Sequence, residues 1–93
     1  MTFEWDASKA ATNLVKHRVS FEDAAAVFLD PLAITFPDPD HSATERREIT
    51  IGCTLKGQLL FVSHCERRTH IRIISARLAT RAEREFYEED SGH

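Results

Sequence analysis

Six arginines in one short stretch are the residues best suited to chemistry in this chain of 93 residues. The formal net charge of the chain is −3, but residues 64–84 hold six arginines against two glutamates. A guanidinium donates two parallel hydrogen bonds to a phosphate and keeps its charge near neutral pH. Since a phosphate-bearing ligand responds to local potential, the stretch indicates a phosphate-binding surface. Its arginines are Arg67, Arg68, Arg72, Arg77, Arg81 and Arg84.

These arginines also have a purely structural interpretation, as surface residues paired with neighbouring acids. Glu83, Glu85 and Glu88 offer partners at helical spacing. The functional interpretation depends on clustering, because a turn, a strand end and the start of a helix near Arg81 would meet at one edge of a sheet. Free N–H groups at that helix start would add to the attraction for an anion. We therefore expect a pocket of guanidinium groups at one sheet edge.

Four further residues are candidates around this pocket. His64 ends an apolar strand three residues before Arg67, and imidazole suits proton transfer near neutral pH, although such a histidine is more often a buried structural residue. Tyr87 could pack with Phe86 or stack on a base. Arg46, with its neighbours Glu45 and Arg47, precedes a predicted strand and could reach the same edge as His64. Lys16 ends the first predicted helix, where a cation complements the helix dipole.

A zinc site is not expected from the cysteines and histidines. Cys53, His64, Cys65 and His70 are close in sequence, but adjacent residues of a strand point to opposite faces, so His64 and Cys65 would not share one ion. The spacing also matches no common zinc-binding pattern. We interpret the two cysteines as small buried apolar side chains rather than a disulfide.

The elements that must position these residues follow from caps and periodicity. Asp6 caps a helix over residues 7–17, with Ala10 and Leu14 on its apolar side and Asn13 facing elsewhere. Ser20 caps a second helix that Pro31 ends, and Thr80 with Glu83 forms a capping box for a last helix. The β-prone segments LAITF, REITIGCT, LLFVSHC and HIRIISA lie between the second and the last helix.

These elements predict an α+β fold with two N-terminal helices, a mainly antiparallel sheet of about four strands and one C-terminal helix, all helices packing on one face. Residues 1–93 suit a single domain. A two-residue turn at Lys56 and Gly57 would pair Cys53 with Leu60, and would keep the two cysteines apart. The sequence shows neither a signal peptide nor a membrane-spanning run, so a cytoplasmic protein is expected.

Three blocks of the sequence resemble the BrnT family, the toxin half of a bacterial type II toxin–antitoxin pair. The blocks are FEWDASKAATNLVKHRVSFEDAAAVF, ERREITIG and IRIISARLATRAEREFYE, and they run from Phe3 to Glu88. The resemblance implies a RelE-like ribonuclease fold, in which helices cover one sheet face and RNA is cleaved on or beside the other. It also implies a cytoplasmic endoribonuclease that cleaves messenger RNA without metal or cofactor, with the 2′-hydroxyl of the RNA as nucleophile.

The resemblance also implies roles and partners. His64 would act as acid or base, Arg67, Arg77 and Arg81 would hold the phosphate, and Tyr87 would stack on or orient a nucleotide. RNA contacts would come from Arg46, Arg68, Arg72, Arg84 and Lys16. The partner would be a BrnA-like ribbon-helix-helix antitoxin, which alone would contact operator DNA. Because the chain reads FVSHCER where relatives are expected to carry VVYTER-like strands, the assignment of His64 has less support than that of the arginines.

Two other functions fit the same residues. A non-catalytic module could use the arginines to dock an acidic segment of the antitoxin, and would then leave cell growth unimpaired when expressed alone. A nucleic-acid-binding module could bind RNA with steep salt dependence and leave it intact.

Overall fold

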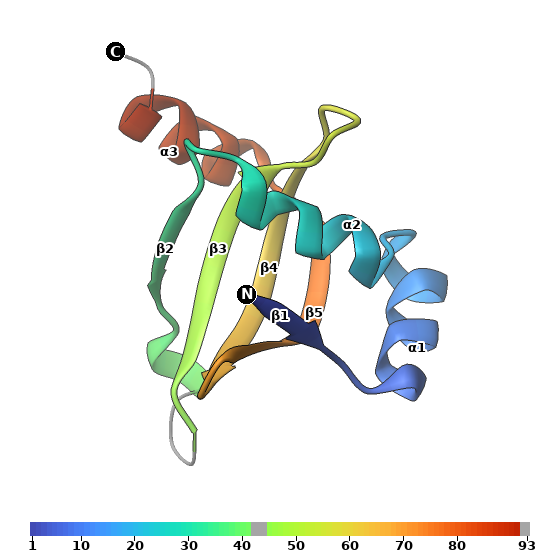
Figure 1. Cartoon of the computed structure of the whole chain (residues 1–93). Coiled ribbons are helices and arrows are strands. Elements are labelled where there is room, and N and C mark those ends of the chain that lie inside the picture. Colours follow the sequence, from blue (N-terminus) through green and yellow to red (C-terminus); the bar gives the residue numbers. More distant parts are fainter. Residues whose placement is uncertain (42–44, 92–93) are drawn as a thin grey trace.

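The computed structural model describes residues 1–41 and 45–91. This part of the chain forms one five-stranded sheet, three α-helices and two short 3-10 helices, η1 and η2 (Figure 1). In chain order the elements are β1 (Thr2–Glu4), α1 (Ala7–His17), α2 (Phe21–Ala26), η1 (Val27–Leu29), β2 (Ile34–Pro37), η2 (Pro39–His41), β3 (Arg47–Cys53), β4 (Leu59–Arg67), β5 (His70–Leu78) and α3 (Arg81–Ser91). The α+β class and the three helices are confirmed.

The sheet is mixed, with the strand order β1-β5-β4-β3-β2. Strands β2 to β5 pair antiparallel in succession, whereas β1 runs parallel to β5 and covers only His70–Arg72 of it. The expectation of about four strands is wrong, because the N-terminal residues form a fifth. Three residues are too few to show an alternating pattern, and the strand they pair with lies at the other end of the chain.

Both N-terminal helices begin where their caps predict. The Asp6 carboxylate accepts a hydrogen bond from the Lys9 backbone N–H at 3.0 Å, and the Ser20 hydroxyl accepts one from the Asp23 backbone N–H at 3.0 Å. Arg18 ends α1 in the left-handed conformation, with φ 57°. The predicted bounds of the first helix are therefore confirmed, and its cap fixes where α1 meets the sheet.

Asn13 attaches α1 to the outer edge of β5. Its Oδ1 accepts from the Ala76 backbone N–H at 3.1 Å, and its Nδ2 donates to the carbonyls of Ala76 at 2.8 Å and Val19 at 3.0 Å. The expectation that Asn13 faces away from the apolar side is wrong: Asn13 is 6% exposed, whereas Leu14 is 51% exposed. The Asn13 amide bonds both the N–H and the carbonyl of Ala76, as a neighbouring strand would. Because buried backbone groups need partners, these bonds decide which side of α1 faces the sheet, rather than the apolar pattern.

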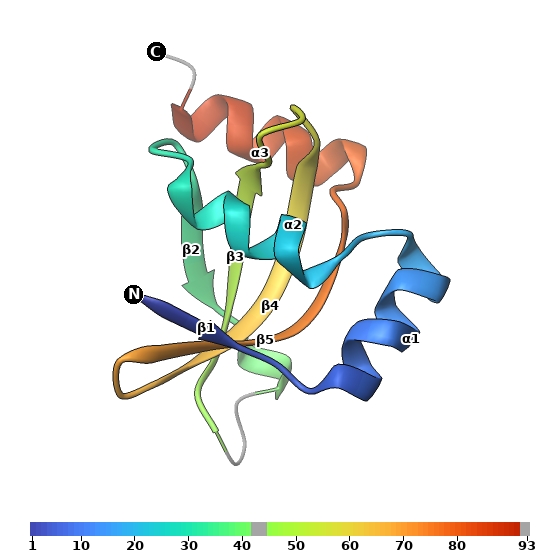
Figure 2. The same cartoon turned by 45° about the vertical axis from the view of Figure 1, so that its right-hand side comes forward.

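The helices cover both faces of the sheet, which corrects the expectation of one covered face. On one face α2 and η1 pack with Phe21, Ala24 and Val27 against Leu60 and Val62. On the other face α3 lies across one end of the sheet (Figures 1 and 2), and its Tyr87 packs against apolar residues of β3 and β4. Because β4 is apolar on both sides, both faces need cover. α3 covers only one end of its face, and the rest stays open.

The β3–β4 turn differs by one residue from the predicted turn. Cys53 pairs with Leu59 instead of Leu60. The Thr54 backbone N–H donates to the Gln58 carbonyl at 2.8 Å, so the turn has three residues, and its Gly57 has φ 82°. A slip of one residue exchanges the two faces of a strand. As a result Phe61, Ser63 and Cys65 of β4 lie on the same face as Ile49, and the neighbouring His64 lies on the other face. The capping box at α3 is confirmed, since Thr80 and Glu83 bond each other's backbone N–H groups.

Candidate functional site

An open hollow of about 430 Å³ lies beside α3 on the sheet face that α2 does not cover. Its floor includes Ile49, Ser63 and Ser75, which are cross-strand neighbours in β3, β4 and β5. One wall is the chain that follows β2. The lining residues are Phe36, Pro37, Asp38, Pro39, Asp40, Arg47, Ile49, Phe61, Ser63 and Ser75. The hollow is therefore apolar at its centre, with hydroxyl, carboxylate and guanidinium groups around it.

Three guanidinium groups gather around Cys65, next to the hollow. Cys65 follows Ser63 on the same face of β4, and its cross-strand neighbours are Arg47 and Arg72. Burial raises the pKa of the Cys65 thiol and the Glu45 carboxylate adds to this, whereas Arg67, Arg72 and Arg47 act in the opposite direction. The register places Arg47 and Arg72 on either side of Cys65, Arg67 follows two residues later on the same face, and Arg47 Nε lies 3.5 Å from the Glu45 carboxylate. They form a basic group, Arg47, Arg67 and Arg72, at one end of the hollow.

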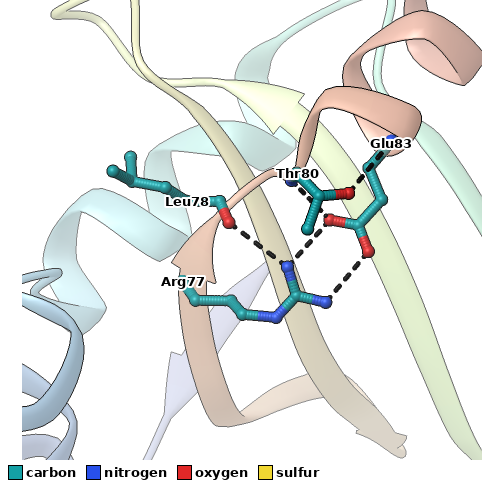
Figure 3. Close-up of polar contacts among 4 residues, drawn as sticks. All are labelled: Arg77, Leu78, Thr80 and Glu83. Atoms are coloured by element: carbon teal, nitrogen blue, oxygen red, sulfur yellow. Dashed lines mark hydrogen bonds and ion pairs between the residues drawn. The ribbon is translucent and has the colours of Figure 1, made fainter.

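Arg77 lies beside Phe61 at the other end of the hollow, and Figure 3 shows it paired with Glu83 of α3. Its two terminal nitrogens donate to the two Glu83 oxygens at 2.8 and 2.9 Å, and one also donates to the Leu78 carbonyl at 3.2 Å. Its guanidinium carbon is 4.0 Å from the ring centroid of Phe61, which lines the hollow. The hydrogen bonds from Arg77 hold the pKa of Glu83 below its usual range. Arg77 is thus fixed beside the hollow as one member of an ion pair.

Among the described residues, Arg47 is the arginine that lines the hollow, and none of the predicted arginines lines it. Arg46, Arg68, Arg81 and Arg84 are exposed, and Arg81 lies 3.5 Å from the Glu85 carboxylate. The expected single pocket of guanidinium groups is therefore wrong. The sequence stretch contributes Arg67 and Arg72 to the basic group at one end of the hollow and the ion-paired Arg77 at the other, because β5 runs the length of the face between them. The structural interpretation, pairing with acids, is confirmed for Arg77 and Arg81.

His64 lies on the opposite face from the hollow, which corrects the expectation that it stands beside the arginines. It is 3% exposed, its Nε2 lies 2.7 Å from the Thr50 hydroxyl, and its ring packs edge-on against Phe28. Burial lowers its pKa to about 4. His64 is therefore a neutral core residue at neutral pH, on the helix-covered side of the sheet.

Tyr87 is also part of the core rather than of an open surface. It is 9% exposed, and its hydroxyl donates to the Asp30 carboxylate at 2.7 Å. Asp30 also accepts from the backbone N–H groups of Cys53 and Leu32, at 2.8 and 2.9 Å. Tyr87 thus attaches α3 to the chain before β2, and its ring is not presented for stacking on a base.

Several residues of the hollow escaped the sequence prediction. Arg47 was named only as a neighbour of Arg46, although the alternation of β3 favours Arg47, which shares a face with Ile49 and Ile51. His70 faces the same side as Arg67, its cross-strand neighbour, and is half-buried. No sequence signal marked Asp38 and Asp40, which come from the proline-rich chain after β2. Lys16 is exposed on α1 and lines a separate groove.

The chain matches a protein-family model described as "Ribonuclease toxin, BrnT, of type II toxin-antitoxin system" over residues 5–83. It belongs to the BrnT ribonuclease toxin family. Membership implies an antitoxin as partner, because a type II system pairs a protein toxin with one. The match spans both sides of the hollow, from α1 to the first turn of α3.

A solved BrnT structure has a similar fold. The crystal structure of the Brucella abortus ribonuclease toxin, BrnT, superposes with a TM-score of 0.69 at 26% sequence identity, and the match covers 87% of this chain and 99% of that one. A search of curated proteins finds no match. In the described residues of this BrnT family member, no helix is long and apolar enough to cross a membrane, and no three His, Cys, Asp or Glu side chains group as metal ligands.

Proposed function

We propose that this BrnT family member cleaves messenger RNA at the hollow on the open sheet face and so inhibits translation. The observation that carries the proposal is the basic group of Arg47, Arg67 and Arg72 at one end of a hollow in a ribonuclease-family chain. Guanidinium groups there would hold the phosphate, and the ring of Phe61 would offer an apolar surface to a base. Arg77 would act from the other end, in competition with Glu83.

The proposed reaction is transesterification within the RNA itself. The 2′-oxygen forms a bond to the adjacent phosphorus, and the bond from phosphorus to the 5′-oxygen breaks. The 2′-hydroxyl proton passes to a base, and the leaving 5′-oxygen takes a proton from an acid. The products carry a 2′,3′-cyclic phosphate and a 5′-hydroxyl. Because negative charge builds up on the phosphate in the transition state, fixed guanidinium groups lower the barrier, and the route needs neither metal nor cofactor.

Three groups near the hollow could transfer the protons. The carboxylates of Asp38 and Asp40 line it, and the His70 imidazole stands on the same sheet face as Arg67 and Arg72. His64 and Tyr87 are left out of the proposed machinery, because each is buried and bonded elsewhere. Separate Asp38→Asn, Asp40→Asn and His70→Gln variants would show which group is needed, since loss of the acid or base typically costs about 10²–10⁴-fold in rate.

The finer family properties belong to the same proposal. We infer a RelE-like fold, a BrnA-like ribbon-helix-helix antitoxin that alone contacts operator DNA, and a cytoplasmic site of action. The sequence resemblance supports each of them. A neighbouring reading frame that encodes a ribbon-helix-helix protein would support the partner, and its co-purification with this chain would test it.

The cleavage proposal is tested with purified protein and a labelled single-stranded RNA. We expect products ending in a 2′,3′-cyclic phosphate, at a rate that a metal chelator leaves unchanged. An Arg67→Gln, Arg72→Gln double variant should cleave at least about 100-fold more slowly, since one lost electrostatic contact to a transition state costs about 10²–10³-fold. Lys56→Gln is the matched control, because Lys56 stands at the β3–β4 turn near Asp23.

Each outcome decides between the three functions. Equal rates for the double variant and the wild type would contradict the assignment of the basic group. Intact RNA with wild-type protein, together with normal growth when the protein is expressed alone, would favour the non-catalytic docking module. Intact RNA bound with steep salt dependence would favour a nucleic-acid-binding module.

A further inference from the structure

A second groove lies between α1 and β5, and it meets the hollow at Ser75. Its volume is about 300 Å³, and its lining residues are Ser8, Lys9, Thr12, Asn13, Lys16, His17, Ile74 and Ser75. Ser75 is the residue that lines both the groove and the hollow. The two concavities therefore adjoin at Ser75, one on the open sheet face and the other between β5 and α1.

The groove exists because β1 is short, and because the Asn13 side chain, instead of a neighbouring strand, bonds the backbone of β5 at Ala76. β1 covers β5 only as far as Arg72, so the later part of β5 faces α1 directly. Asn13 bonds Ala76 and holds α1 at this edge. Lys9, Thr12 and Lys16 lie on the same side of α1 as Asn13, since residues three and four apart share a face of a helix. The bond at Asn13 thus fixes both lysines along the groove.

The charge of the groove favours a polyanion. Its charged lining side chains are the ammonium groups of Lys9 and Lys16, with the His17 imidazole at the end of α1. Ser8, Thr12 and Ser75 supply hydroxyl groups, which donate hydrogen bonds to phosphate oxygens. Asp6 acts as the cap of α1 and accepts from the Lys9 backbone N–H. Lys16 lies in the last turn, where a lysine also suits the helix end, so the decisive observation is that the groove adjoins the hollow at Ser75 rather than the charge alone.

We propose that the groove between α1 and β5 binds the single-stranded RNA beyond the nucleotides that occupy the hollow, with Lys9 and Lys16 contacting its phosphates. The inference depends on the proposed function, since it extends the same substrate. The strand would cross β5 at Ser75, whose exposed hydroxyl stands where the two concavities meet. Lys9 and Lys16 are then positioning residues that hold the RNA, and the chemistry stays in the hollow.

The test compares a short and a longer RNA on a Lys9→Gln, Lys16→Gln double variant. The short RNA fills only the hollow, and the longer one reaches α1. We expect the variant to raise KM for the longer RNA, to leave kcat unchanged and to process the short RNA like the wild type. Loss of two phosphate contacts should also reduce the slope of the logarithm of the RNA-binding constant against the logarithm of the salt concentration by about 1.4. One phosphate contact to single-stranded RNA contributes about 0.7 to this slope. Both lysines are exposed, so the variant should fold.

The outcomes separate this inference from the proposed function. Lys56→Gln, which removes one lysine charge away from the groove, should leave KM and the salt slope unchanged. An unchanged KM and salt slope in the double variant, with wild-type cleavage intact, would overturn the groove assignment and leave that surface to a protein partner. An equal loss for the short and the longer RNA would also overturn it, because it would indicate a general charge effect. If wild-type protein cleaves neither RNA, the proposed function fails first.

Discussion

Thr35, Thr50 and His64 form a polar chain across β2, β3 and β4. The Thr35 and Thr50 hydroxyl oxygens are 2.7 Å apart, and His64 Nε2 is 2.7 Å from the Thr50 oxygen. Among the described residues, His64 Nδ1 has no hydrogen-bond partner. Since a buried unpaired donor costs more than a buried unpaired acceptor, we assign the proton to Nε2, which donates to Thr50, which in turn donates to Thr35. A second proton on Nδ1 would be buried without an acceptor.

The first prediction concerns acid stability. The unperturbed pKa of 6.5 applies to His64 in the unfolded chain, and burial lowers the folded value to about 4. Between these values the unfolded chain takes up a proton that the folded protein excludes, so the free energy of unfolding falls as the pH falls through this window. The loss should reach about 3 kcal/mol, at about 1.4 kcal/mol per pKa unit. Urea unfolding at a series of pH values measures it.

A His64→Gln variant is the comparison, because glutamine keeps a donor for Thr50 and does not titrate. Its free energy of unfolding should change much less across the same window. Asp30 and Glu83 also have lowered pKa values, but both proteins retain them, so their contribution cancels in the difference. Parallel curves for variant and wild type would contradict the assignment of this window to His64.

The second prediction concerns Asn13, whose amide bonds both backbone groups of Ala76. Asn13→Ala leaves those groups and the Val19 carbonyl without their partner, at about 1–3 kcal/mol for each buried group left unpaired. We expect a loss of about 2 kcal/mol or more in the free energy of unfolding, measured in urea. The control is Leu14→Ala, which removes a half-exposed side chain and should cost under about 1 kcal/mol. Equal losses in the free energy of unfolding for the two variants would mean that the Asn13 hydrogen bonds do not stabilise the contact between α1 and β5.

At the scale of elements, α3 is held by two polar contacts as well as by its apolar side. Glu83 in its first turn binds Arg77 of β5, and Tyr87 in its second half bonds Asp30 ahead of β2. Phe86 adds an edge-on contact with Phe36, with ring centroids 5.9 Å apart. The helix thus connects β5 with the chain that precedes β2. It lies at the end of the hollow that Phe61 lines.

The third prediction tests this attachment. Tyr87→Phe removes the hydrogen bond to the Asp30 carboxylate, and a hydrogen bond to a charged group is worth about 1.5–3 kcal/mol. The free energy of unfolding should fall by about that amount, and hydrogen exchange should speed up in α3 more than in β4. Glu88→Gln, an exposed change on the same helix, should alter neither. Unchanged exchange in α3 of the Tyr87→Phe protein would contradict the role of this contact.

Caps and alternation predicted most elements, because those signals are local. Asp6, Ser20 and the Thr80 capping box marked helix starts, and the β-prone runs gave four of the five strands. The sheet register depended on one turn, and a three-residue turn in place of two exchanged the faces of β4. With the wrong register, His64 was predicted on the face of Ile49. In the structure Ser63 and Cys65 lie on that face instead. Asn13 was missed because its partner, Ala76, is distant in sequence.

On the scale of the whole molecule, the two sheet faces differ in how much of each the helices cover. α2 and η1 close one face over an apolar core, whereas α3 covers only one end of the other (Figure 2). The open part carries Arg47, Arg67 and Arg72 beside a hollow, although the chain as a whole is acidic. Because the field near a surface depends on its own charges, this face can attract a polyanion despite the net charge of −3.

The most direct test of the account is a map of backbone amide shifts by NMR during titration with a 2′-O-methyl RNA, which binds without offering a free nucleophile. We predict shifts in β3, β4 and β5 around Arg47, Ser63 and Arg72, continuing through Ser75 to α1, and small changes in α2 and η1. Shifts confined to α2 and η1, or none at RNA concentrations that saturate cleavage, would contradict the placement of the RNA on the open sheet face.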